Sequence, residues 1–154
     1  MQEEELKSVS NHKAIKPNEL TIGSIIRTNR GEVIRVESIS TKRQHRKVGY
    51  HRPDDPYHIH YVRLAVCEGI PVTRELLEAN GWVLARSFPY VDIYCIPFRA
   101  QLELYCNEKD HTLTGDVRVS GAQQKYFKSS LHNVQMALIA GGCPEVADWF
   151  KTII

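Results

Sequence analysis

One short helix, expected between two β-rich stretches, constrains the fold of this chain more than any other feature of its sequence. Thr73 is a favourable N-cap, and the helix formers after it end at Asn80-Gly81, a typical C-cap. This pattern predicts a helix over residues 73–80. Alternating and β-branched apolar runs precede and follow it, and a longer helical pattern comes last. The sequence therefore predicts an α+β protein with antiparallel sheets.

The first β-rich stretch is predicted to form a hairpin. Its strands are Ser24–Thr28 and Glu32–Ser38, and the turn between them ends in Gly31, where a positive φ is needed. Because an isolated hairpin is only marginally stable, we expect the run Ile59–Cys67 to pair with it. The order of strand, tight turn and strand resembles the opening of an SH3-like small barrel. An SH3-like β unit is therefore predicted for residues 17–67.

Residues 40–58 are expected to form a long loop or an extended hairpin tip outside the core. The segment holds two prolines, a glycine and two aspartates among many basic residues. This composition is unlike that of a core element, and connections of this length are often functional.

After the helix, four runs have the character of strands. They are Trp82–Ser87, Val91–Pro97, Gln101–Cys106 and Thr112–Val119, with a polar turn at Asn107–Asp110 between the last two. A C-terminal helix that covers this sheet is predicted from apolar residues at helical spacing, namely Phe127, Leu131, Val134 and Leu138. The helix is expected to end at Gly141-Gly142, before a second short helix or docking tail over residues 148–154.

Composition bounds the class of protein. The chain has 154 residues, of which 42% are hydrophobic and 25% charged, with a formal net charge of +2. These values are typical of a globular domain and argue against a disordered, collagen-like or generally basic nucleic-acid-binding protein. We predict a flexible leader over residues 1–16, acidic at Glu3–Glu5, and one compact domain over residues 17–154 with parts at 17–67 and 68–154.

The sequence also predicts a soluble, cytoplasmic protein. Its apolar stretches fall short of the ~20 residues of a membrane span, and its first residues lack the features of a secretory signal. The four cysteines have no CxxC spacing, so neither a zinc ribbon nor a thioredoxin-type site is indicated. We expect them to be reduced thiols.

Three segments, in matching order and spacing, resemble a known family. IPVTRELLEANGW resembles an element PIPLTEEWLLKFGF, ELTIGSIIRTNRGEVIRV resembles an opening ELRIGNWV with its glycine turn, and LHNVQMAL resembles a closing helix VHQLQNLYFALTG. These elements belong to small uncharacterised proteins found in Bacteroidetes, their phages and mobile elements. The resemblance spans most of Leu20 to Ala140. It implies a cytoplasmic accessory protein, in the host cell if phage-encoded, and carries over no activity or catalytic residue.

A basic stretch within residues 41–52 is the first candidate site. Clustered cations neutralise phosphates, and a tyrosine among them adds a stacking surface. The pattern allows two interpretations: a site for an anionic partner (nucleic acid, nucleotide or acidic protein), or a solvated hairpin tip. The residues of the predicted site are Lys42, Arg43, His45, Arg46, Lys47, Tyr50 and Arg52.

A metal site is the second candidate. His58 and His60 are two residues apart, so on a strand they share one face. Two imidazoles and a carboxylate could hold Zn²⁺ or Fe²⁺, whereas a histidine that caps a loop is the alternative. The predicted ligands are His51, Asp54, His58 and His60, with Asp55 nearby.

Cysteine chemistry has weaker support in the sequence. Cys67 lies seven residues after His60 on one predicted strand, so the two side chains face opposite sides and no base lies near the thiol. Cys95 and Cys106 fall in apolar strand patterns and are interpreted as small core residues. The aromatic residues at 88, 90, 94 and 98 share one parity and are expected in the core or, if exposed, on a partner-binding surface.

Three classes of function follow. The first is a non-enzymatic accessory protein of a phage or mobile element that binds a protein partner. The second is a nucleic-acid-binding accessory protein that uses the basic loop 42–52, and the third is a metal-dependent enzyme with a His/Asp site near residues 51–60. The sequence predicts no catalytic residue, no cofactor and no membrane association, and it leaves the oligomeric state open.

Overall fold

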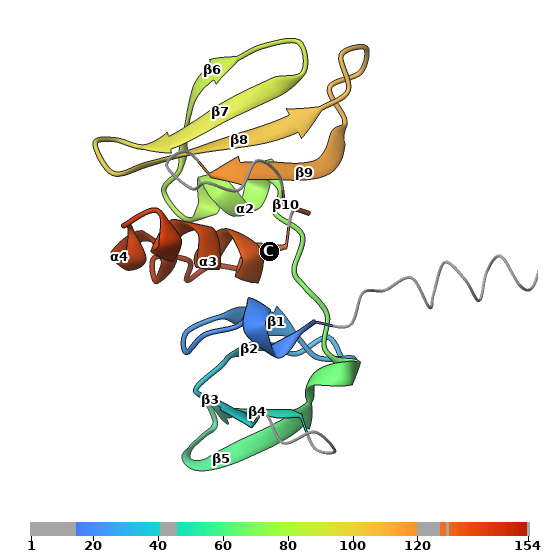
Figure 1. Ribbon diagram of the computed structural model, residues 1–154, viewed down its shortest axis with the longest axis vertical. Helices are drawn as coiled ribbons and strands as arrows, with labels where there is room; N and C mark the ends of the chain where they lie inside the picture. Colours follow the sequence, from blue (N-terminus) through green and yellow to red (C-terminus); the bar gives the residue numbers. More distant parts are fainter. Residues whose placement is uncertain (1–14, 41–45, 120–126, 129, 154) are drawn as a thin grey trace, which may run out of the picture. The chain divides into compact units, whose positions relative to one another are not determined.

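The computed structural model describes residues 15–40, 46–119, 127–128 and 130–153. Within these residues the protein is mixed α+β, with small antiparallel sheets and short helices, as the sequence predicts (Figure 1). The chain divides into two compact units, which we call unit 1 (Met1–Gly69) and unit 2 (Ile70–Ile154). The acidic residues Glu3–Glu5 of the predicted leader lie outside the described residues.

Unit 1 contains two small sheets. Strands β1 and β2 form a hairpin, and β3, β4 and β5 form an antiparallel sheet in that order. The elements of the unit are η1 (Pro17–Glu19), β1 (Ile25–Arg27), β2 (Val33–Arg35), β3 (Ser38–Ser40), β4 (Lys47–Arg52), β5 (Asp55–Arg63) and η2 (Leu64–Val66).

The predicted N-terminal hairpin is confirmed in a shorter form. Ile26 lies opposite Ile34, and Gly31 in the turn has a φ of +79°. The second predicted strand is broken, because the chain leaves β2 and enters the other sheet as β3. The expected pairing of the hairpin with residues 59–67 is wrong. Strand β5 pairs with β4 instead. Arg27 of β1 forms a single β-bridge with Glu68, just after that run.

The expectation that residues 40–58 stay outside the core is also wrong for the described part of that segment. Strands β4 and β5 are joined by the two-residue turn Pro53-Asp54. Val48 and Tyr50 are buried, at 0% and 4% exposure. Val48 and Tyr50 are two residues apart and so share one face of the strand, and Gly49 between them is buried as well.

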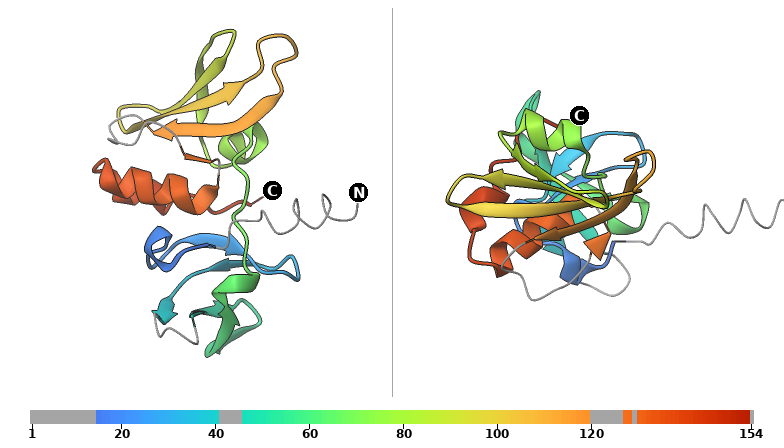
Figure 2. Two further views of the ribbon diagram at one scale, coloured as in Figure 1. Left: turned by 45° about the vertical axis from the view of Figure 1, so that its right-hand side comes forward. Right: turned by 90° about the horizontal axis from the view of Figure 1, so that it is seen from above.

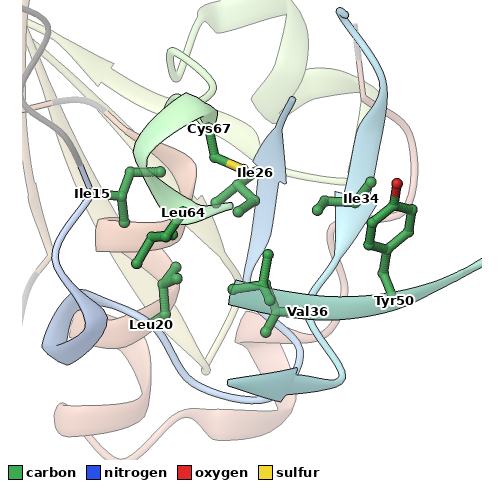
Figure 3. Close-up of a cluster of buried hydrophobic side chains, with 9 residues drawn as sticks. Ile15, Leu20, Ile26, Ile34, Val36, Tyr50, Leu64 and Cys67 are labelled. Carbon is green, nitrogen blue, oxygen red and sulfur yellow. The ribbon is translucent and has the colours of Figure 1, made fainter. Parts of the chain in front are cut away.

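The core of unit 1 draws side chains from both sheets and from the segments around η1 and η2 (Figure 3). Ile15, which falls in the predicted leader, is buried in it. The cluster consists of Ile15, Leu20, Ile26, Ile34, Val36, Val48, Tyr50, Leu64 and Cys67, with Ile39 and Val62 packed against it.

Unit 2 contains one five-stranded antiparallel sheet, and its helices lie on one face of that sheet (Figures 1 and 2). The strand order is β10-β9-β8-β7-β6. The elements are α2 (Arg74–Ala79), β6 (Val83–Ser87), β7 (Val91–Ile96), β8 (Ala100–Cys106), β9 (Leu113–Val119), β10 (Phe127–Lys128), α3 (Leu131–Ala140) and α4 (Pro144–Ala147). The four strands predicted after the first helix are therefore present.

Both predicted helices are confirmed, with one correction. The N-cap Thr73 accepts a hydrogen bond from the backbone N–H of Leu76 at 3.1 Å. Leu131, Val134 and Leu138 are buried at 1% exposure or less, as the helical spacing predicts. Phe127 does not belong to this helix face, because residues 127–128 pair with β9 as β10 and α3 begins only at Leu131.

The end of the described chain folds back within unit 2. Phe150 is buried and stacks on Trp82, with ring centroids 6.1 Å apart. Asn80 accepts hydrogen bonds from the backbone N–H groups of Lys151 and Thr152, at 2.7 and 2.9 Å. Of the two alternatives predicted for residues 148–154, the docking tail is the one observed over the described residues, with Phe150 buried, whereas the short helix α4 lies before that segment. Within the described residues, no helix is long and apolar enough to span a membrane.

Candidate functional site

The structure separates the residues of the predicted basic site. Lys42, Arg43 and His45 lie outside the described residues. Tyr50 is buried in the core, so its ring is not a solvent-facing stacking surface. Arg52 Nε lies 3.1 Å from Glu32 Oε1, an ion pair that raises the pKa of the Arg52 guanidinium. Arg46 and Lys47 remain as cations that have no carboxylate partner among the described residues.

The histidines of the predicted metal site fall into two places. His58 Nδ1 lies 2.7 Å from one carboxylate oxygen of Asp55, and His60 Nε2 lies 3.0 Å from the other. These hydrogen bonds, that of His58 first, lower the pKa of the Asp55 carboxyl. His51 instead pairs with Glu37, and Asp54 is exposed in the hairpin turn. The structure therefore brings His58 and His60 together around Asp55 rather than Asp54.

The solvent-facing side of the β3–β4–β5 sheet, which we call the outer face of unit 1, carries exposed aromatic and apolar side chains. Val48, Tyr50 and Val62 face the core, so their strand neighbours face the other side. Tyr61 is 61% exposed and Ile59 is 49% exposed, and Tyr57, two residues further along β5, is 91% exposed. A patch of this kind on a small unit is characteristic of a binding surface.

Gly49 makes this packing possible. It lies opposite both Ser38 of β3 and Tyr61 of β5. A Cβ atom at position 49 would approach the Ser38 hydroxyl to 2.2 Å and side-chain carbons of Ile59 and Tyr61 to 3.1 Å. The Ile59 and Tyr61 side chains therefore lie close over the strand at this position, and a larger residue there would force them and the Ser38 hydroxyl to shift.

Two cations lie directly opposite each other next to this patch. Lys47 of β4 pairs in register with Arg63 of β5, two positions from the Gly49–Tyr61 pair and therefore on the same face. Like charges in directly opposed positions destabilise a sheet. Neither side chain has an ion-pair partner among the residues that the structure describes. The positive charge at this position is therefore not neutralised by any described residue.

A cluster that sequence reasoning missed lies in unit 2. Asp92 of β7, Cys106 of β8 and His111 each offer a ligand atom, and these atoms all lie within 4.8 Å of one another. Arg74, the first residue of α2, donates from Nε to Asp92 Oδ2 at 3.1 Å and from Nη2 to the His111 carbonyl at 2.6 Å. Among the described residues, Asp92, Cys106 and His111 are the only group of three or more potential ligands that lie this close together.

The cluster is largely buried. Asp92 and Cys106 are each 3% exposed, whereas the His111 side chain is 39% exposed. Burial, and next the nearby Asp92 carboxylate, raise the pKa of the Cys106 thiol. The sequence held one signal for this cluster. Asp92 and Tyr94 are two residues apart on β7 and so share its buried face, and a carboxylate in the core needs a partner.

The other cysteines carry no comparable arrangement. Cys67 is buried, its Sγ lies 3.5 Å from the Arg63 carbonyl, and burial raises its pKa to about 11. It is therefore protonated at neutral pH and a poor nucleophile. Cys143 donates to the Arg99 carbonyl at 3.1 Å, and all four cysteines are free.

The aromatic residues of the 88–98 segment are divided between core and surface. Tyr94 is buried on β7, whereas Phe88, Tyr90 and Phe98 lie in the turns that flank it and are exposed. Comparison with known proteins adds no family to this description: no family model, no curated protein and no solved structure matches the chain.

Proposed function

We propose that this chain is a non-enzymatic accessory binding protein and that the outer face of unit 1 binds single-stranded nucleic acid. One observation carries the proposal. Lys47 and Arg63 lie opposite each other without a carboxylate partner among the described residues, beside the exposed side chains of Ile59 and Tyr61.

The chemistry of this face fits a nucleic-acid strand. Cations neutralise backbone phosphates, and exposed aromatic rings stack on bases whatever the sequence. Tyr57 and Tyr61 provide two such rings on β5, and Lys47, the first residue of β4, lies near Tyr61 with Arg46 just before it. The combination of unpaired cations with exposed tyrosines favours a nucleic-acid strand over an acidic peptide. The carboxylates of such a peptide would pair with the cations but would not stack on the rings.

A single strand is a better ligand for this face than a duplex. In a duplex the bases are already stacked on one another, so their faces are closed to protein side chains. A sheet that presents rings and cations has the features of known single-strand binders. The small net charge of +2 implies that affinity arises from this local patch, not from the whole surface.

The resemblance to small proteins of phages and mobile elements, and the SH3-like character predicted for residues 17–67, are consistent with an accessory role of this kind. A protein partner on the same face is the competing interpretation. The test below distinguishes the two, because a protein partner would not produce nucleic-acid binding that depends on Tyr61.

The test is a titration of fluorescently labelled single-stranded DNA and RNA oligonucleotides with the full chain, followed by anisotropy over a salt series. We expect salt-sensitive binding to single strands that is stronger than binding to a duplex of the same sequence. Tyr61→Ala is expected to weaken binding by about 1–3 kcal/mol, the cost of losing one stacked base. Tyr61→Phe keeps the ring and is expected to bind as the unaltered chain does.

Matched controls come from unit 2. Tyr90 is 58% exposed, close to the 61% of Tyr61, so Tyr90→Ala removes an equally accessible ring elsewhere. Replacement of both Lys47 and Arg63 by glutamine is expected to reduce the dependence of log K on log salt by about 1.4, which corresponds to two phosphate contacts. Arg118→Gln, at a cation paired with Glu103, is expected to leave that slope unchanged.

Two results would overturn the proposal. One is the absence of salt-sensitive binding to any single strand. The other is binding that Tyr61→Ala and Tyr90→Ala weaken equally, because this would place the ligand somewhere other than the outer face of unit 1.

A further inference from the structure

Asp92, Cys106 and His111 of unit 2 have no role in the binding function proposed for unit 1, yet they bring a carboxylate, a thiol and an imidazole together. We propose that these three residues form a binding site for one divalent transition-metal ion of the Zn²⁺ class. Sulfur, nitrogen and oxygen ligands in this combination are those that Zn²⁺ and chemically similar ions bind.

Two of the three distances between ligand atoms approach those of a metal site, and the third, between Cys106 and Asp92, is within 4.8 Å. Cys106 Sγ lies 3.5 Å from His111 Nδ1. Ordinary zinc–sulfur and zinc–nitrogen bonds around a tetrahedral ion put the two ligand atoms about 3.5 Å apart. His111 Nδ1 lies 3.8 Å from Asp92 Oδ2, so this edge needs to close by only a few tenths of an ångström. The second ring nitrogen, Nε2, lies further from the sulfur, at 3.9 Å, so Nδ1 is the closer ligand atom.

The ligands are held by neighbouring groups, as metal ligands usually are. Ser87 donates to Asp92 Oδ1 at 2.7 Å, which leaves Oδ2 directed at the cluster. The turn before His111 is fixed by a backbone bond from His111 N–H to the Asn107 carbonyl at 2.9 Å. His111 itself has a φ of +58°, a conformation that non-glycine residues rarely adopt and that is often found at functional sites.

Arg74 is the rival cation of the cluster. Its Nη2 lies 3.4 Å from His111 Nδ1 and its Nε lies 3.1 Å from Asp92 Oδ2. A thiolate and a carboxylate balance the charge of a divalent ion, so the guanidinium needs only to move away from the imidazole when the ion binds. The His111 carbonyl, which accepts from Nη2 at 2.6 Å, is not one of the proposed ligands, so this bond does not compete with the ion.

The site is open on one side. The His111 side chain is 39% exposed, which gives an ion access from solvent. With three protein ligands, the fourth position of a tetrahedral ion is left for water or for a small ligand, as in zinc sites that are not purely structural.

The test uses Co²⁺ as a spectroscopic probe for Zn²⁺, added to the reduced full chain. We expect one equivalent to bind, with the charge-transfer absorption of a cobalt–thiolate bond, and Zn²⁺ to displace it. Cys106→Ser is expected to abolish that absorption. Cys95→Ser, which alters a cysteine of the neighbouring strand β7, is the matched control and is expected to keep it.

A second variant keeps the test decisive if Cys106→Ser does not fold. His111→Asn retains a residue that tolerates a positive φ, so the turn is preserved while the imidazole is lost. We expect it to weaken Co²⁺ binding at least about 100-fold, and Ser87→Ala to weaken it about 10-fold, the lower end of the effect of supporting residues. Circular dichroism of each variant checks its folding.

The proposal fails if the unaltered chain binds no stoichiometric Co²⁺ or Zn²⁺, or binds Co²⁺ without a thiolate signal. It also fails if His111→Asn binds Co²⁺ as tightly as the unaltered chain. In each of these cases the three residues do not form the proposed metal site, and the Arg74–Asp92 contact is a structural ion pair between α2 and the sheet.

Discussion

The solvent-facing sides of the two units' sheets carry opposite charge patterns on similar backbones. In unit 2, Glu103 of β8 lies opposite Arg118 of β9, with 3.7 Å between their charged atoms, and it also accepts a hydrogen bond from Tyr105. In unit 1, Lys47 lies opposite Arg63. Opposed unlike charges stabilise a sheet, and opposed like charges destabilise it. The comparison teaches that stability accounts for the opposed charges of unit 2 but not for those of unit 1, which is why we propose an anionic ligand there.

The largest expected effect is a loss of stability from a substitution in the core of either unit. It tests whether a change in one unit leaves the binding properties of the other unaltered. Leu131→Ala in α3 and Ile26→Ala in β1 each remove a fully buried side chain. Each is expected to lower the free energy of unfolding by about 2–5 kcal/mol through lost burial and the cavity left behind. Chemical denaturation followed by circular dichroism measures both.

Nucleic-acid binding provides the control for these core variants. We expect Leu131→Ala to leave binding by the outer face of unit 1 unchanged, because the folded chain still predominates and the binding residues lie in the other unit. An unchanged denaturation midpoint in Leu131→Ala would show that the face assigned to α3 is wrong. Loss of binding in the folded variant would show that the site extends beyond unit 1.

The second prediction concerns the buried faces of the two sheets. Among the described residues, the buried side chains of unit 1 include no carboxylate, whereas unit 2 buries the charged Asp92 at 3% exposure. Asp92→Asn leaves Arg74 with a neutral partner and is expected to destabilise the metal-free chain by about 1.5–3 kcal/mol, the range for hydrogen bonds to charged groups. Thermal or urea unfolding measures the difference.

Asp116→Asn is the matched control for Asp92→Asn. Asp116 is an exposed aspartate of β9 in the same sheet, so its substitution is expected to change stability by less than about 0.5 kcal/mol. Equal effects of the two substitutions would mean that the Arg74–Asp92 ion pair contributes nothing to the fold.

The fold was predictable where the signal is local. The Thr73 cap, the Asn80-Gly81 end of α2 and the period of two along β8 each specify an element within a few residues. The β4–β5 hairpin was missed because its charges and prolines resemble those of a loop. Only the partner strand shows that Val48 and Tyr50 share a buried side and that Pro53 falls in the turn.

The candidate site was predictable only in part, and for a related reason. The cations of β4 are visible in the sequence. Whether Tyr50 can act as a stacking ring depends on which face of the strand is buried, and the register of the sheet determines that face. Tyr61 faces solvent instead. The Asp92–Cys106–His111 cluster joins segments up to 37 residues from Arg74, so no local spacing predicts it.

A smaller effect is expected at the start of α2, which fixes the position of Arg74 next to Asp92 in unit 2. Thr73→Ala removes the side-chain oxygen that accepts from the Leu76 N–H and is expected to cost about 1 kcal/mol of stability. Thr73→Ser keeps an oxygen in that position and is expected to stay close to the unaltered chain. If serine proves as costly as alanine, the threonine methyl group, not the cap, is what matters.

The smallest expected effect reverses the charge pattern of each outer face and tests the comparison most directly. Arg63→Glu turns the like pair with Lys47 into an unlike one, so we expect it to stabilise the chain by about 0.2–1 kcal/mol while it weakens nucleic-acid binding. Arg118→Glu opposes Glu103 with a second carboxylate, and we expect a loss of stability of similar size with binding unchanged. Denaturation curves and anisotropy titrations on the same samples measure both quantities. If Arg63→Glu instead lowers stability, the opposed Lys47 and Arg63 side chains do not destabilise the fold, and the argument for an anion at this position is lost.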